Sequence, residues 1–181
     1  MSNAQRLVTA DEFERAVRED DRCELVEGRV VPMTTVSLSH ARTVIRIGAL
    51  LDAHVRSHRI PVFVAAELGC KLSMRTVRAP DVAIVRRERV STPDERGFLN
   101  GPPDVAIEVV SPGDRPREID EKVSEYLASG TPLVVVIDPE QQDCRVFRPD
   151  VPSITLGSED VLDLGDVVPG FRCCVAEIFG S

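Results

Sequence analysis

The 181-residue chain has no long apolar run and no segment that resembles a secretion signal. The longest apolar stretch, Leu133 to Ile137, is far too short to cross a bilayer. Near the N-terminus, no basic segment precedes an apolar stretch and a small-residue cleavage site. We therefore expect a soluble cytoplasmic protein that does not bind a membrane.

The five cysteines lack the spacing of a disulfide framework or a zinc site. Their number is odd, no Cys-x-x-Cys pair occurs, and Cys173 is adjacent to Cys174. His54 and His58 are four residues apart on an expected helix, a spacing that could bind a metal. Surface histidines explain this pair more simply.

Positive charge is scarce, because 30 acidic residues outnumber 22 basic residues and give a net charge of −8. Phosphate binding requires positive charge, so this balance argues against a protein that coats nucleic acid non-specifically. An enzyme with a local basic patch is still compatible with it. The candidate residues for nucleic-acid binding are Arg75, Arg78, Arg86 and Arg87. A solvated strand and loop explains these arginines equally well.

Lysine is rare, since only Lys71 and Lys122 among the 22 basic residues are lysines. Arginine keeps its proton near neutral pH, whereas a buried lysine can lose it and offers a compact charge. Lys122 therefore invites a chemical explanation. The alternative is an ordinary solvent-facing lysine on a helix.

The order of the expected elements predicts an α/β (α+β) fold with a mixed central sheet flanked by helices. Residues Thr9 to Glu12 form a capping box for a first helix that ends near Asp20. A charged helix is also expected from Pro116 to Ser129, and Gly130 would end it. Strands are expected at residues 23–32, 62–67, 69–73, 81–86, 104–110 and 133–137, with weaker strands between 145 and 164.

The longest expected helix runs from Ser37 to about Ser57. Its apolar residues recur at intervals of three and four, at Leu38, Ala41, Ile45, Gly48, Leu51 and Val55. We expect one domain over residues 1–181, with residues 1–8 as a disordered start.

Glu108 lies in a strand that is otherwise apolar. Successive side chains alternate, so Val105, Ile107 and Val109 face one way, and Ala106, Glu108 and Val110 face the other. An unpaired carboxylate buried there would cost several kcal/mol, so Glu108 requires a cation or a strong donor nearby. A structural salt bridge to an arginine would also meet that need.

Asp81 and Lys122 are the residues that the sequence offers as partners of Glu108. Asp81 opens a strand, and Lys122 lies on the following helix with Tyr126 four residues on, on the same face. Two acidic residues at the ends of neighbouring strands can hold Mg²⁺ through oxygen ligands. A lysine beside them can orient an attacking water or stabilise the transition state. Each residue has a plainer explanation when it is taken singly. Asp81 would be a turn residue, Lys122 a surface lysine and Tyr126 a packing residue.

Two segments, residues 78–85 and 103–112, resemble the Uma family of endonucleases within the PD-(D/E)xK nuclease superfamily. The resemblance extends from about residue 9 to 179, with short motifs in the same order. Further matches are Glu24 to Gly28, His40, Glu118, Lys122, Tyr126, Gly130, Ile137 to Pro139 and Pro169 to Phe171.

The resemblance implies a restriction-endonuclease-like core in which Asp81, Glu108 and Lys122 are catalytic and Mg²⁺ or Mn²⁺ is the cofactor. Asp81, Glu108 and the carbonyl of Val109 would bind the metal. The residues implied around them are Glu24, His40, Glu67 and Tyr126.

The chain departs from the family pattern at a few positions. Val110 stands where the superfamily places a lysine, and Lys122 matches the migrated position of that lysine on the next helix. Leu133 and Val134 replace an aromatic pair, and Glu118 replaces an aspartate. The last two departures bear on packing or partners rather than on the metal ligands.

We therefore predict a divalent-metal-dependent endonuclease that hydrolyses phosphodiester bonds in DNA and acts as a homodimer. One alternative is a non-catalytic, dimeric binding or regulatory protein that retains the nuclease fold. Another is a hydrolase of a different phosphodiester, because the same residues would serve it.

Overall fold

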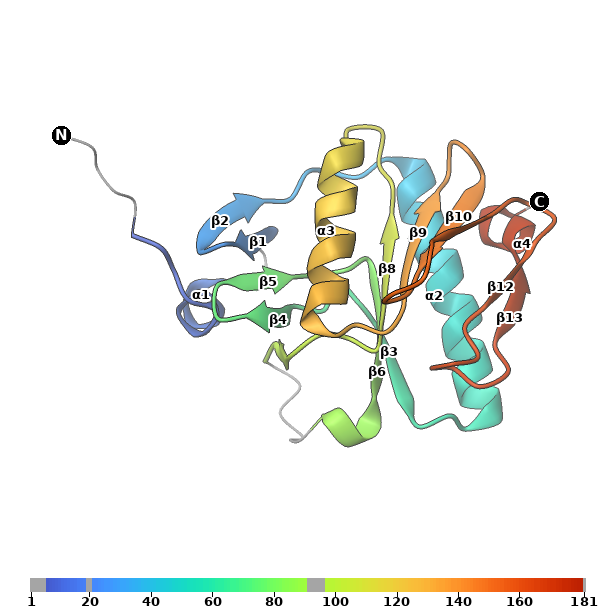
Figure 1. The fold of residues 1–181 in the computed structure, drawn as a ribbon, viewed down its shortest axis with the longest axis horizontal. Coiled ribbons are helices and arrows are strands. Elements are labelled where there is room, and N and C mark those ends of the chain that lie inside the picture. Colours follow the sequence, from blue (N-terminus) through green and yellow to red (C-terminus); the bar gives the residue numbers. More distant parts are fainter. Residues whose placement is uncertain (1–5, 19–20, 91–96, 181) are drawn as a thin grey trace.

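The structure is a computed structural model that describes residues 6–18, 21–90 and 97–180. Figure 1 shows two larger sheets set beside each other, with a long helix on the far side of one of them. The six-stranded sheet has the order β11 (Ile154–Leu156), β10 (Asp143–Phe147), β9 (Val134–Asp138), β8 (Val105–Val109), β6 (Val82–Arg86) and β3 (Val62–Ala66). The five-stranded sheet has the order β2 (Arg29–Pro32), β1 (Cys23–Val26), β5 (Thr76–Arg78), β4 (Cys70–Ser73) and β7 (Leu99–Asn100).

Both larger sheets are mixed, as the sequence predicts. β8 and β9 are parallel, as are β4 and β7, whereas the other neighbouring strands of these two sheets are antiparallel. A small antiparallel pair, β12 (Val161–Asp163) and β13 (Arg172–Cys174), precedes the C-terminal helix α4 (Val175–Phe179). This tail packs on the body through the buried side chains of Val175 and Ile178.

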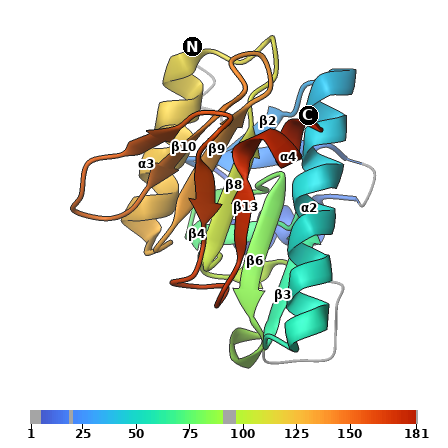
Figure 2. The ribbon, with the colours of Figure 1, turned by 90° about the vertical axis from the view of Figure 1, so that its right-hand side faces the viewer.

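Helices cover both faces of the six-stranded sheet. Figure 2 shows α2 (Leu38–His58) and α4 on one side of β8 and α3 (Pro116–Ser129) on the other. Val105, Ile107 and Val109 of β8 belong to the core on the α2 side. Ala106 faces the core built with Ile119, Val123 and Tyr126 of α3. The predicted alternation of β8 is therefore confirmed, and it places Glu108 on the α3 side.

The first helix begins as predicted but ends earlier. Thr9 and Glu12 form the expected capping box, and α1 runs over Ala10–Ala16 with Val17 as its C-cap. Its predicted end at Asp20 lies outside the described residues. At the end of the predicted disordered start, the backbone N–H of Val8 donates to the carbonyl of Gly28 at 2.9 Å.

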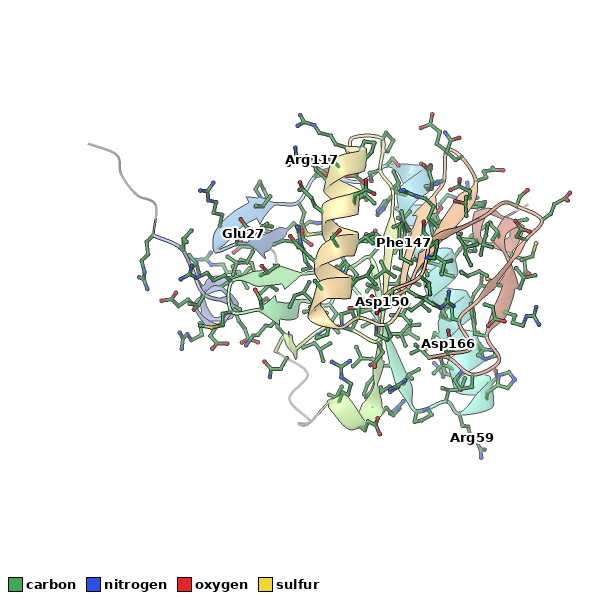
Figure 3. All side chains as sticks on the ribbon, viewed as in Figure 1. Glu27, Arg59, Arg117, Phe147, Asp150 and Asp166 are labelled. Atoms are coloured by element: carbon green, nitrogen blue, oxygen red, sulfur yellow. The ribbon has the colours of Figure 1, made fainter. Side chains whose placement is uncertain are left out.

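Helix α2 has the predicted length but not the predicted buried face. Ser37 caps its start, and Arg59 ends it in a left-handed conformation with a side chain that points away from the body (Figure 3). Leu38 and Ile45 are 76% and 69% exposed. The buried face is His40, Thr43, Ile47, Leu51 and Val55, so only Leu51 and Val55 of the predicted stripe are buried. Because His40 and Thr43 are polar, the apolar periodicity of the sequence does not identify this buried face.

Gly48 lies inside α2 with open space beside it, since a Cβ at this position would meet no atom within 4 Å. We expect Gly48→Ala to raise the free energy of unfolding by about 0.5–1 kcal/mol, because alanine loses less conformational entropy in a helix. Urea unfolding monitored by circular dichroism would measure this change. Gly130→Ala is the matched control and should destabilise the protein, because Gly130 has a φ of +102°. Equal or lower stability of Gly48→Ala would contradict the expectation.

Among the described residues, no helix is both long enough and apolar enough to span a membrane.

Candidate metal centre

Glu108 lies at the centre of the site and is only 3% exposed. Its Oε2 accepts a hydrogen bond from Lys122 Nζ at 2.9 Å, and its Oε1 accepts one from the hydroxyl of Tyr126 at 2.9 Å. Lys122 and Tyr126 are one helical turn apart on α3, which packs over this face of the sheet. The carboxylate thus has the cation and the donor that its burial requires.

Asp81 is brought next to Glu108 by strand pairing. β6 is antiparallel to β8 with Val82 opposite Ile107, so the residue before β6 lies near the end of β8. The Oδ2 of Asp81 accepts a hydrogen bond from the backbone N–H of Val109 at 2.6 Å. The same oxygen is 3.3 Å from Nε2 of His40. Asp81, Glu108, Val109 and Lys122 are therefore neighbours, as the predicted site requires.

His40 is buried in the first turn of α2, where its backbone N–H donates to the cap residue Ser37. Burial alone would lower the pKa of His40, but Asp81, with Asp114 and Glu108, outweighs burial and raises it. Within the described residues, Nδ1 of His40 is buried and has no hydrogen-bond partner. His40 is thus held against Asp81 in the buried first turn of α2.

Glu24 connects the five-stranded sheet to the site. Its Oε2 accepts from Arg78 at 2.7 Å, and its Oε1 accepts from the backbone N–H of Ala79 at 3.0 Å. Oε1 is also 3.9 Å from Lys122 Nζ. Glu24 therefore fixes the segment that leads into Asp81 and lies beside the candidate catalytic lysine.

Arg78 was predicted to bind nucleic acid with other arginines, but it is buried and does not belong to an exposed patch. It is 7% exposed and forms ion pairs with Glu24 and with Glu125, the latter at 2.6 Å. Burial opposes its charge, but the two glutamates outweigh burial and raise the pKa of Arg78. A guanidinium engaged in this way cannot reach nucleic acid, so its role is structural. Glu125 is not among the predicted site residues, although it follows Lys122 by three residues and so lies next to it on the surface of α3.

The other predicted patch arginines do not gather around Asp81. Arg86 and Arg87 lie at the opposite end of β6, roughly 16 Å away at the usual rise of a strand. Arg86 lies near Asp104, and Arg87 stacks over the ring of Phe63 at 4.4 Å. Arg75 is exposed in the turn between β4 and β5. The predicted cluster is therefore spread over the molecule.

Glu67 and Lys71 take part in contacts away from Glu108. Glu67 is exposed and pairs with Arg22 at 2.7 Å. Lys71 pairs with Asp11 and with Glu14 of α1, each at 2.7 Å. The second lysine of the chain thus ties α1 to β4, and its role is structural.

The donor atoms around Asp81 suit a hard cation that takes few protein ligands. Two carboxylates and the carbonyl of Val109 offer oxygen, and Mg²⁺ usually binds one or two carboxylates and keeps several waters. Both contacts of Asp81 fall on Oδ2, and a carboxylate can accept at about four positions in all. Within the part of the chain that the structure describes, no group of three or more His, Cys, Asp or Glu could hold an ion. A donor set made only of oxygen suits Mg²⁺ or Mn²⁺ better than zinc, which is usually bound by nitrogen and sulfur ligands.

A pocket of about 420 Å³ reaches this site from the side of α2. His40 and Asp81 are among its lining residues, together with residues of α2 and β3 such as Val44, Ile45 and Val64. Solvent can therefore approach Asp81 although His40 and Glu108 are buried.

The protonation of Glu108 is expected to make stability depend on pH in the absence of metal. Burial raises the pKa of Glu108 from 4.5 to about 7, although Lys122 acts in the opposite direction. The native state then binds more protons than the unfolded state between these two pKa values. The resulting contribution of Glu108 to the free energy of unfolding is fully present below about pH 4.5 and is lost as the pH rises through about 7. The loss amounts to about 3 kcal/mol at 1.36 kcal/mol per pH unit.

Urea unfolding at about pH 5 and about pH 8, with a chelator present, measures this contribution. Glu108→Gln cannot titrate and should lose this part of the pH dependence. If the free energy of unfolding changes by the same amount between the two pH values in wild type and in Glu108→Gln, the raised pKa of Glu108 is wrong.

The comparisons with known proteins agree with this geometry. The model of the Uma2 family, described as "Putative restriction endonuclease", matches residues 10–176. The chain belongs to the Uma2 family. The crystal structure of a "putative nuclease belonging to DUF820" from Anabaena variabilis ATCC 29413 has a TM-score of 0.82 with this chain. The match covers 95% of this chain and 97% of that chain at 20% sequence identity, and it establishes the fold.

A second solved structure, the cryoEM structure of a DrdV–DNA complex, matches 81% of this Uma2 chain and 12% of its own chain at 14% identity. Its TM-score of 0.41 is too low to support a conclusion. No curated protein matches the chain. The predicted restriction-endonuclease-like fold class and family are confirmed, and the Uma2 description together with the fold supports a nuclease.

Proposed function

We propose that this Uma2 protein is a divalent-metal-dependent endonuclease that hydrolyses phosphodiester bonds in DNA. The observation that carries the proposal is the convergence of Asp81, Glu108 and Lys122 through the contacts of β6, β8 and α3. The nuclease-like fold and the family description support the same chemistry.

Asp81, Glu108 and the carbonyl of Val109 would hold Mg²⁺ or Mn²⁺. When bound, such an ion lowers the pKa of a water and neutralises charge on a phosphoryl oxygen. Lys122 is placed to orient the attacking water or to stabilise negative charge on the phosphate, because its Nζ is 2.9 Å from Glu108. The same amine lowers the pKa of Glu108 and so opposes the larger effect of burial.

The surrounding residues hold these groups in place. Tyr126 fixes the second oxygen of Glu108, His40 lies against Asp81, and Glu24 anchors the segment before Asp81. Glu67 borders the same pocket as Asp81, where it could contact a substrate or a water network. We place Tyr126, His40 and Glu24 as positioning residues rather than as catalytic ones.

A second candidate substrate is a smaller phosphodiester. The observation that favours it is the scarcity of positive charge at the site, since Arg78 is buried and Arg86 and Arg87 lie at the far end of β6. A long DNA duplex requires several phosphate contacts, whereas a small substrate does not.

Incubation of the purified protein with plasmid and with single-stranded oligonucleotides tests the proposal. We expect cleavage with Mg²⁺ or Mn²⁺ and none with EDTA. Hydrolysis of bis(p-nitrophenyl) phosphate without cleavage of DNA would favour the smaller substrate. Absence of hydrolysis of any phosphodiester would contradict both candidates.

A homodimer forms part of the proposal, because enzymes that cut both strands of a duplex often use two copies related by symmetry.

A further inference from the structure

The pocket that leads to Asp81 has walls of small and apolar residues. We call it the α2–β3 pocket, because Ala41, Gly48 and Ala49 of α2 line it together with Val64 and Ala65 of β3. Its volume of about 420 Å³ lies within the range of about 300–1,000 Å³ that is usual for small-molecule sites. Its size and its apolar lining therefore suit a ligand as large as one nucleoside.

Gly48 keeps the wall of the α2–β3 pocket open. It lies in the interior of the 21-residue helix α2, where glycine is less favourable than alanine. A Cβ at this position would meet no atom within 4 Å, so packing within the chain does not require a glycine here. The missing side chain instead leaves space for a group that comes from outside the chain.

The charges of the lining residues oppose a phosphate in the body of the pocket. Asp52, Glu67 and Asp81 line it, whereas none of its described lining residues is a lysine or an arginine. Phosphate groups are bound through positive charge, but a nucleobase is uncharged. A phosphate would therefore stay beside Asp81 and its cation, and the base attached to it would face the apolar walls.

His40 joins the α2–β3 pocket to the candidate metal centre. It lines the pocket, and its Nε2 is 3.3 Å from Oδ2 of Asp81. Its Nδ1 is buried without a hydrogen-bond partner in the part of the chain that the structure describes. A buried polar atom without a partner is costly, so this atom favours a ligand that brings a polar group to it.

We propose that the α2–β3 pocket receives one nucleoside of the substrate, the one attached to the phosphate at Asp81 and Glu108. This inference rests on the proposed function, because nuclease chemistry places the phosphate at those carboxylates. A base inside a duplex is stacked and paired, so it enters the pocket only after it leaves the stack. The preferred substrate is therefore DNA with an unpaired nucleotide at the cleavage site.

An NMR titration of the isotope-labelled protein with deoxycytidine, in EDTA, tests the pocket without metal and without catalysis. We expect the amide signals of Gly48, Ala49 and Val64 to shift and to saturate. Gly48→Leu fills the pocket and should weaken this binding by at least about tenfold. Ala53→Leu adds the same side chain at an exposed position of α2 outside the pocket, and it should bind like wild type. Circular dichroism checks that both variants fold.

Single-turnover cleavage in Mg²⁺ tests the class of substrate. One oligonucleotide is compared as a single strand and as a fully paired duplex, and we expect the single strand to be cleaved at least about tenfold faster. Gly48→Leu should cleave the single strand at least about tenfold more slowly than wild type, whereas Ala53→Leu should not differ from it.

The two experiments separate this inference from the proposed function. Deoxycytidine binding in the pocket without cleavage of any DNA would contradict the nuclease and leave the nucleoside site standing. Cleavage by Gly48→Leu at the wild-type rate, or no shift of the pocket signals with deoxycytidine, would overturn the nucleoside site and leave the nuclease standing. Equal cleavage of single strand and duplex would overturn the preference for an unpaired nucleotide.

Discussion

Asp81→Asn is expected to lower the rate of DNA cleavage by at least about 10³-fold, because the loss of a metal ligand removes several kcal/mol of charge stabilisation. Asparagine retains an oxygen that accepts from the backbone N–H of Val109, the contact that Asp81 makes at 2.6 Å. The fold should therefore persist, and a thermal melt near that of wild type would confirm it. Single-turnover cleavage of plasmid in excess Mg²⁺ measures the rate.

The matched control is Asp163→Asn, which changes an exposed aspartate on β12 and should cleave like wild type. If Asp81→Asn retains more than about a tenth of the wild-type rate, Asp81 is not an essential ligand.

Lys122→Arg is expected to reduce cleavage by about 10²–10³-fold, the range measured when one preorganised donor is removed from an active site. The compact amine of Lys122 sits 2.9 Å from Glu108, and a planar guanidinium cannot occupy that position in the same way. Because the positive charge is kept, Glu108 retains a cation and the protein should remain folded.

Lys71→Arg is the control for this change, since Lys71 is the other lysine of the chain and pairs with Asp11 and Glu14 of α1, away from Glu108. We expect it to retain full activity. If the two variants cleave at equal rates, Lys122 acts only as a counter-charge for Glu108, and the catalytic assignment fails.

Much of the site could be predicted because strand and helix periodicities constrain it directly. The alternation in β8 placed Glu108 on the opposite face from Ile107, and the four-residue spacing on α3 placed Lys122 and Tyr126 together. Both predictions are confirmed by the hydrogen bonds to Glu108. The proximity of Asp81 depends on which strands pair, and the family resemblance supplied that information rather than the local pattern.

The misassigned residues share a physical cause. Arg78 was placed on a basic surface, but a run of arginines does not reveal that Glu24 and Glu125 surround one of them. The apolar periodicity of α2 predicts that Ile45 is buried, whereas the helix turns His40 inward against Asp81 and leaves Ile45 exposed. In both cases tertiary pairing of polar groups overrode the local pattern, and the polar groups involved belong to the candidate site or border it.

A crystal structure with bound Mn²⁺, analysed by anomalous scattering, tests the metal centre most directly. We predict one anomalous peak between Asp81 and Glu108, with metal–oxygen distances of about 2.1 Å and the carbonyl of Val109 in the coordination shell. The same soak of Asp81→Asn should show no peak at this position. Manganese bound elsewhere, with Glu108 still held by Lys122 and Tyr126, would contradict the metal centre and leave these carboxylates a structural role.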